Sequence, residues 1–116
     1  MKAIRPSAYA RFLNALDSLD RVSPSKKLDC IEEQLLNHIY LASVNGEKLL
    51  VGDVILLEQF GSQATLHGRL KNLVGKGFIQ LHGDKADGRR KSVQITNKAE
   101  KHYQQLSECL SKAIKL

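Results

Sequence analysis

The sequence predicts a mainly α-helical protein with one small antiparallel β-hairpin. Three observations favour this fold class: apolar residues recur at helical spacing over most of the chain, a glycine-rich stretch separates two short alternating segments, and both prolines lie before residue 25. The 116 residues suit one domain, and 42% hydrophobic with 26% charged residues is typical of a globular protein. We therefore expect a single domain over residues 1–116.

The N-terminal part, residues 1–46, is expected to hold two helices. Ser7 is a suitable N-cap for the first. Its apolar stripe consists of Tyr9, Phe12, Leu13, Leu16 and Leu19. The pair Ser23–Pro24 suits the cap and first turn of the second helix, and Asn45–Gly46 suits its end. The apolar stripe of this second helix consists of Leu28, Ile31, Leu35, Ile39 and Ala42.

Residues 47–96 are expected to form a helix, a turn and a second helix, followed by a hairpin. The short apolar run Lys48–Val51 is compatible with a strand. The next segment, Gly52–Glu58, has the pattern of a brief helix, with Asp53 placed near its positive end. A tight turn at Gln59–Gly61 then leads to the second helix.

The second helix of this pair is expected over residues 62–75, with Ser62 as its N-cap. At 3.6 residues per turn, its side chains separate onto two faces. One face is apolar and carries Leu66, Leu70, Leu73 and Val74. The other is polar and carries Gln63, His67 and Lys71. Gly75 and Gly77 are expected to end the helix.

A hairpin and a final helix complete the chain. Beginning at Phe78, apolar and polar residues alternate as in a half-buried strand, and the alternation resumes at Val93 and Ile95. Between them, residues 83–91 form a glycine-rich, basic turn, which we call the wing. Thr96 is expected to cap a helix over residues 97–116. Its apolar stripe consists of Ala99, Tyr103, Leu106, Leu110 and Ala113.

This order of elements is that of a winged helix-turn-helix and points to double-stranded DNA. A helix fits the major groove when one face is buried in the protein and the other carries polar side chains, as residues 62–75 do. Arginines in a wing can reach phosphates or a narrow minor groove. Between residues 61 and 101, nine basic side chains stand against three acidic ones, an excess that equals the net charge of the whole chain, +6.

The same region resembles the recognition helix and wing of the MarR family of winged-helix regulators. The resemblance covers Lys48–Glu108, and its most specific parts are the sequences LVGKGFI and DKADGRRKSVQIT. It implies that Asp87 orients Arg89 through a charge-assisted bond and that Arg89 enters the minor groove. With the neighbouring cations included, the candidate DNA-binding residues are Ser62, Gln63, Thr65, His67, Gly68, Arg69, Lys71, Lys85, Arg89, Arg90 and Lys91.

The sequence also departs from the family pattern. Gly68 stands where an arginine or another polar contact residue is common, and Arg69 stands where an apolar residue often packs against the core. In the family the terminal helices interlock with those of a second subunit, so the resemblance implies a homodimer with N- and C-terminal dimerisation helices. The chain is shorter than most members, and a small-molecule effector is left open.

The expected function is that of a sequence-specific DNA-binding transcriptional regulator of the repressor type. The alternative is a winged-helix module that binds another protein and no specific DNA. The sequence has no Ser-His-Asp group, phosphate-cradling glycine loop or metal-spaced cluster, so no enzyme, catalytic residue, metal or cofactor is expected.

Two further features concern the compartment. The longest uninterrupted apolar stretch, Val54–Leu57, is too short for a membrane span, so we expect a cytoplasmic protein without a membrane partner. Cys30 and Cys109 stand alone and are expected to be reduced thiols buried beside the apolar stripes. Redox sensing, which occurs in relatives of the family, is the alternative.

Overall fold

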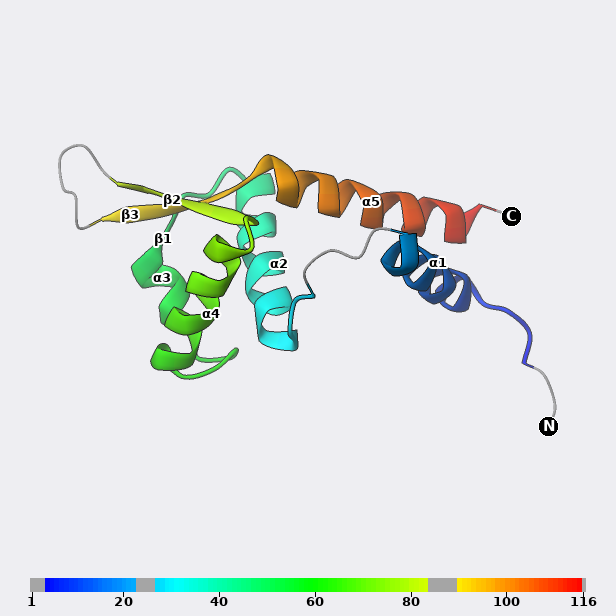
Figure 1. The fold of residues 1–116 in the computed structure, drawn as a ribbon, viewed down its shortest axis with the longest axis horizontal. Helices are drawn as coiled ribbons and strands as arrows, with labels where there is room; N and C mark the ends of the chain where they lie inside the picture. Colours follow the sequence, from blue (N-terminus) through cyan, green and yellow to red (C-terminus); the bar gives the residue numbers. More distant parts are fainter. Residues whose placement is uncertain (1–3, 23–26, 84–89, 116) are drawn as a thin grey trace. The chain divides into compact units, whose positions relative to one another are not determined.

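The computed structural model describes residues 4–22, 27–83 and 90–115 (Figure 1). Its elements in chain order are α1 (Ala8–Val22), α2 (Cys30–Val44), β1 (Leu49–Leu50), α3 (Val51–Ile55), α4 (Gln63–Gly75), β2 (Ile79–Gly83), β3 (Lys91–Ile95) and α5 (Asn97–Ile114). The expected class, mainly α with a small antiparallel sheet, is confirmed.

The chain divides into two compact units. Unit 1 comprises Met1–Lys27 and Lys101–Leu116, and unit 2 comprises Leu28–Glu100. Unit 2 contains the helix-turn-helix and the sheet, so the elements expected within residues 47–96 all belong to it. The two units are described separately below, and a single domain over the whole chain stays a prediction.

The sheet of unit 2 is antiparallel with the strand order β1-β3-β2, and β2 and β3 form the long hairpin seen in Figure 1. In the register, Val93 stands between Leu49 on one side and Leu81 on the other, while Ile95 pairs with Ile79. Val93 and Ile79 are buried, whereas Gln80 and Gln94 in the intervening row are exposed. The predicted alternation holds at these positions but not throughout the hairpin, because Leu81 is 36% exposed and Ser92 is buried next to Val93.

The core of unit 2 lies between α2, α3, α4 and one face of the sheet. Its apolar side chains with at most 7% exposure are Leu35, Leu36, Ile39, Ala42, Val54, Leu66, Leu70, Leu73, Phe78, Ile79, Val93 and Ala99. This confirms the leucine face of α4 and, on α2, the predicted residues Leu35, Ile39 and Ala42. Ile31 is only half-buried, and Leu28, also half-buried, precedes the helix. Val74 was also expected on the leucine face of α4, but this prediction is wrong, because the side chain is 39% exposed at the margin of the stripe. Helix α4 is thus held by a narrow row of leucines.

Three helix starts agree with the expected caps. Ser7 Oγ accepts a hydrogen bond from the Ala10 N–H at 3.1 Å. Ser62 Oγ accepts one from the Thr65 N–H at 3.2 Å. Thr96 Oγ1 accepts one from the Ala99 N–H, also at 3.2 Å. Each hydroxyl satisfies a backbone donor that the first turn of a helix leaves without a partner.

The expected start of α2 is wrong. Ser23 and Pro24 lie outside the described residues, and the helix begins only at Cys30, with Asp29 as its N-cap. Asp29 Oδ1 accepts from the Glu32 N–H at 2.8 Å, and Glu32 Oε1 accepts from the Asp29 N–H at 2.9 Å. This reciprocal capping box satisfies two backbone donors and fixes the start of the helix there.

Unit 1 consists of α1 and the later turns of α5. Arg11 Nε donates to the Ala113 carbonyl oxygen at 2.8 Å, which joins α1 to the C-terminal end of α5. Leu110 was expected in the buried stripe but is 50% exposed, whereas its neighbour Cys109 is buried. Several other apolar side chains of this unit are also exposed, namely Ile4, Tyr9, Leu13 and Ile114.

The two cysteines differ in their surroundings, and both are free thiols. Cys109 is buried on α5, as expected. Cys30 is exposed, so the expectation that it is buried beside the stripe of α2 is wrong. It is the first residue of that helix, ahead of the turns that pack on the core.

Candidate nucleic-acid interface

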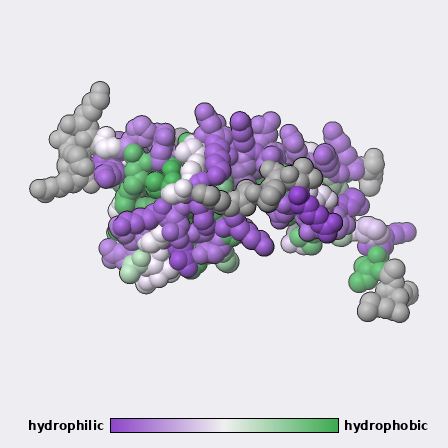
Figure 2. Space-filling view, viewed as in Figure 1, coloured by the Kyte–Doolittle hydropathy of each residue, from purple (hydrophilic) through white to green (hydrophobic). Residues whose placement is uncertain are grey.

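Helix α4 has one buried and one exposed face, as the sequence predicts. Leu66, Leu70 and Leu73 are buried, whereas Gln63, His67 and Lys71 are exposed at intervals of four residues. Figure 2 shows hydrophilic side chains over much of the helical part of unit 2 that faces the viewer. The exposed row offers an amide, an imidazole and an ammonium group, which are the groups used to read base edges and bind phosphates.

The N-terminal turn of α4 is closed by its own hydroxyl groups. Besides capping the helix, Ser62 donates through Oγ to Thr65 Oγ1 at 2.9 Å. Thr65 is half-buried, and its methyl group would lie 3.5 Å from a Cβ placed on Gly61. Both predicted contact residues therefore also have a structural role in shaping the turn before α4.

Arg69 is directed at the start of α2. Its Nε lies 2.7 Å from Asp29 Oδ2, and the two side chains are 36% and 44% exposed. The Nε atom is buried, and its N–H does not meet that oxygen with hydrogen-bond geometry, so the contact is an ion pair without an aligned hydrogen bond. The arginine is thus accommodated at a position where an apolar residue is common. Its role in binding DNA stays a prediction.

Lys76, the C-cap of α4, is also used inside the protein. Its Nζ lies 2.6 Å from Glu32 Oε1, and Glu32 is only 1% exposed. Burial by itself raises the pKa of the Glu32 carboxyl, but hydrogen bonds from Lys76, from the Asp29 backbone and from Asn72 act in the opposite direction. Together with the charge of Lys76 they hold the pKa below its ordinary value. Glu32 is therefore a buried carboxylate anion at neutral pH.

A second lysine holds the end of α4 from the first turn of α5. Lys98 Nζ donates to the Lys76 carbonyl oxygen at 2.6 Å and lies 4.8 Å from the centre of the Phe78 ring. A cation at a helix C-terminus is favourable because of the helix dipole. Together with Arg69 and Lys76, it makes three cations of the basic region that are engaged within the protein. The carboxylates of Asp29 and Glu32 offset the charges of Arg69 and Lys76, whereas Lys98 keeps its charge. The local net charge is therefore smaller than the count over residues 61–101.

The wing lies partly outside the described residues. Lys85, Asp87 and Arg89 belong to the part that is not described, so their expected roles stay predictions. Arg90 and Lys91 are described, and both are exposed at the start of β3.

The structure groups Arg90 with two residues that the sequence reasoning did not assign to the interface. A hollow of about 580 Å³ is lined by Lys48, Leu50, Asp53, His82, Gly83, Arg90 and Ser92. It brings Lys48 and His82 beside Arg90, because the register aligns Leu50, Ser92 and His82 across the three strands. The strand register was the signal that could have found them, but pairing cannot be read from the chain order alone.

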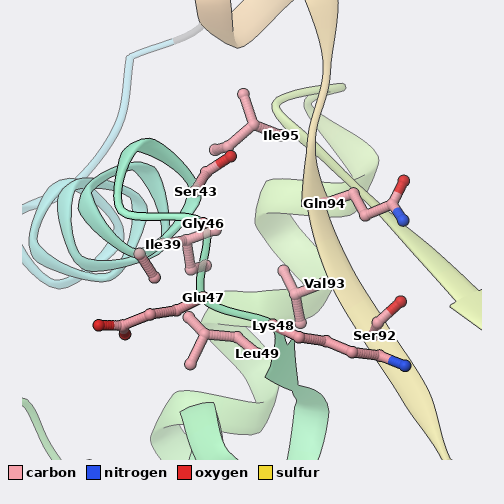
Figure 3. A pocket seen from close by; sticks show the side chains of 11 residues that line it. Ile39, Ser43, Gly46, Glu47, Lys48, Leu49, Ser92, Val93, Gln94 and Ile95 are labelled. Carbon is pink, nitrogen blue, oxygen red and sulfur yellow. The ribbon is translucent and has the colours of Figure 1, made fainter.

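Another cavity, of about 420 Å³, lies between the end of α2, the segment that leads into β1, and β3 (Figure 3). Ile39, Leu49 and Val93 give it an apolar lining, while the charged ends of Glu47 and Lys48 point in opposite directions (Figure 3). Of these, Ile39 and Val93 belong to the core beneath the sheet, whereas Leu49 is half-buried. Ser43, Ser92 and Gln94 also line the cavity, which flanks the core of the scaffold.

The glycine at the centre of α4 is not required by packing. A Cβ on Gly68 would meet nothing within 4 Å. Because glycine is a poor helix former, Gly68→Ala is expected to raise the free energy of unfolding by about 0.5–1 kcal/mol, measured by urea denaturation. Gly77→Ala is the matched control and should destabilise by about 1–2 kcal/mol, because Gly77 has φ +83°. A loss of stability in Gly68→Ala would contradict this reading of the helix.

Two other kinds of site, a metal centre and a membrane span, are absent from the described part of the chain. Residues 4–22, 27–83 and 90–115 contain no group of three or more histidine, cysteine or acidic side chains that could hold a metal ion. Within the same ranges, every helix is too short or too polar to cross a lipid bilayer.

Neither a protein-family model nor a curated protein sequence matches this chain. Several solved structures do resemble it. MepR of S. aureus in complex with DNA aligns with a TM-score of 0.63 and 19% identity over 90% of this chain and 70% of MepR. A MepR variant bound to an oligodeoxyribonucleotide aligns with a TM-score of 0.65 and 20% identity over 90% of this chain and 71% of the variant.

A second regulator has the same fold. The heme sensor protein PefR of Streptococcus agalactiae, in complex with heme, aligns with a TM-score of 0.63 and 19% identity over 90% of this chain and 69% of PefR. MepR and PefR are MarR-family regulators. At this level of identity the likeness concerns the fold, and it agrees with the order of elements, the caps and the two-faced α4 described above. The chain therefore has a MarR-like winged-helix fold.

Proposed function

We propose that this protein is a sequence-specific double-stranded DNA-binding transcriptional regulator that acts as a repressor and a homodimer. The observation that carries the proposal is the exposed row of Gln63, His67 and Lys71 on a helix that is anchored by a buried leucine face. The major groove is about 12 Å wide and admits one helix, so such a row can meet base edges. DNA-bound MepR, which shares the fold, supports the proposal.

Each side chain of the row has a chemistry suited to a different contact. Gln63 can make paired hydrogen bonds to an adenine edge, and it stands in the first turn of α4, where recognition helices commonly meet the bases. His67 can donate to or accept from a base edge. Lys71 contributes a point charge that suits a phosphate or a guanine.

Phosphate contacts are expected around the wing. Arg90 and Lys91 are exposed there, and Lys48 and His82 line the same hollow as Arg90. In our proposal Arg89 reaches the minor groove with Asp87 orienting it, and Lys85 adds a further backbone contact. These contacts hold the protein on DNA without reading its sequence.

The homodimer is proposed from the apolar surface of unit 1. Tyr9, Leu13, Leu110 and Ile114 are between 47% and 67% exposed on α1 and α5. A second copy could cover such side chains, and two-fold symmetry would then place two α4 helices on half-sites one DNA turn apart. A small-molecule effector is left open.

Selection of bound duplexes from a random pool, followed by salt titration, tests the proposal. An inverted repeat should be recovered, because a two-fold dimer reads each half-site in the same way. Affinity for the selected duplex should fall with salt, with a slope of about −0.9 in log K against log salt for each phosphate contact. Failure to enrich any sequence, with affinity indifferent to salt, would overturn the proposal and favour a protein-binding module.

A further inference from the structure

A buried polar network joins the start of α2 to the C-terminal half of α4. Glu32 Oε1 receives two donors, the Asp29 N–H at 2.9 Å and Lys76 Nζ at 2.6 Å. Asn72 also donates to Glu32 through its side chain. Next to this group, Asp29 forms the ion pair with Arg69. The two acidic residues at the start of one helix thus engage three residues of the other.

The three residues on α4 lie along one stripe of the helix. Arg69, Asn72 and Lys76 are spaced at i, i+3 and i+7, so they share a face. His67 and Lys71 point to a different face, because consecutive residues are turned by about 100° around the helix axis. Contacts on the first stripe therefore fix where the second one points.

Stability does not explain such a network well. Burying a carboxylate and an ammonium group costs desolvation energy, and well-packed apolar residues are often as stabilising in their place. The leucine row of α4 already supplies apolar packing to α2 and the sheet. Leucine contacts tolerate small sliding and rotation, whereas a 2.6 Å charged hydrogen bond to a fully buried oxygen permits little of either.

We propose that Glu32 is a positioning residue that fixes the rotation and axial register of α4 against α2 through Lys76 and Asn72. This inference rests on the proposed function, because the purpose of the fixed register is to aim Gln63, His67 and Lys71 at the bases. Lys98 completes the arrangement, since it holds the Lys76 carbonyl oxygen from the first turn of α5. Lys76 is thereby fixed at both its side chain and its backbone.

The variant Glu32→Gln tests this role, with Glu33→Gln as the matched control. Glu33 is exposed in the same first turn of α2 and carries the same charge. Removing a negative charge strengthens binding to a polyanion, so the control should bind all duplexes as well as the wild type or better. Glu32→Gln should instead lose about tenfold in affinity for the selected duplex, the equivalent of a single base contact. Its affinity for a scrambled duplex should change less than about twofold.

A readout without DNA separates the two proposals. Amide hydrogen exchange along α4 should be faster in Glu32→Gln than in the wild type and unchanged in Glu33→Gln. If the wild type binds the selected and scrambled duplexes with equal affinity, the proposed function fails. The exchange rates alone then decide whether Glu32 anchors α4. Unchanged exchange in α4 would overturn the inference, and so would equal affinity losses on selected and scrambled duplexes.

The milder variant Asn72→Ala decides the matter if Glu32→Gln does not fold. Asn72 is exposed, so its truncation removes the hydrogen bond to Glu32 without leaving a cavity in the core. A smaller loss in the same direction, confined to the selected duplex and accompanied by faster exchange in α4, supports the anchoring role. No change in either measurement overturns it.

Discussion

Replacing Leu66 with alanine is expected to lower the free energy of unfolding by about 2–5 kcal/mol, measured by urea denaturation. Leu66 is fully buried, at 0% exposure, and is the first residue of the leucine row of α4. Its Cδ2 atom would lie 3.5 Å from a Cβ on Gly61, so the side chain also packs against the turn before the helix. Truncation removes buried apolar surface and leaves a cavity beneath the candidate interface.

Val74→Ala on the same helix is the control. Because Val74 is 39% exposed, its truncation should change the free energy of unfolding by about 0.5 kcal/mol or less. Similar losses in both variants would mean that the buried face of α4 is not where the structure places it. That result would also remove the basis for an outward row of Gln63, His67 and Lys71.

Local patterns were enough to predict most of the elements. Ser62 and Thr96 were found as caps because a hydroxyl that accepts from a backbone N–H three residues later is a local event. The two faces of α4 follow from its period, and the hairpin follows from alternation on both sides of a glycine-rich turn. The polar row of the candidate interface was predicted for the same reason.

Contacts between distant parts of the chain could not be predicted in this way. The start of α2 is a separate case, because its signal is local: Asp29 and Glu32 are three residues apart and form the capping box there, whereas the prediction relied on Ser23–Pro24. The same Glu32 binds Lys76, 44 residues away, and nothing in the local sequence of either residue indicates the other. A charge count over residues 61–101 therefore leaves out the carboxylates of Asp29 and Glu32, which pair with two of its cations.

The departures from the family pattern illustrate the same limit. The sequence shows an arginine at a position where an apolar residue is common, but only the fold shows that Asp29 meets Arg69 there. Lys48, His82 and Arg90 come from three separate segments, and strand pairing brings them to one hollow. Spacing along the chain describes a helix face well, whereas a site built across strands depends on their register.

Exchanging Gln63 for alanine and Arg90 for alanine is expected to separate base reading from phosphate binding. Gln63→Ala should cost about 1–3 kcal/mol of discrimination at one base-pair position, because an exposed amide in the first turn of α4 can form a bidentate contact with a base edge. Arg90→Ala should weaken binding to all duplexes alike and reduce the salt slope by about 1, as expected when one phosphate contact is removed.

The measurement is a set of binding titrations on the selected duplex and its single-position variants, each at several salt concentrations. Gln104→Ala and Arg21→Ala serve as controls. Both residues are exposed on helices of unit 1, and the two substitutions remove an amide and a guanidinium group, as Gln63→Ala and Arg90→Ala do. Neither control should alter base preference, and Arg21→Ala should leave the salt slope nearly unchanged because Arg21 is already paired with Asp17 at 2.9 Å. If the Gln63 and Arg90 variants lose equal affinity on every duplex, α4 does not read bases, and the outward row acts only as a charged surface.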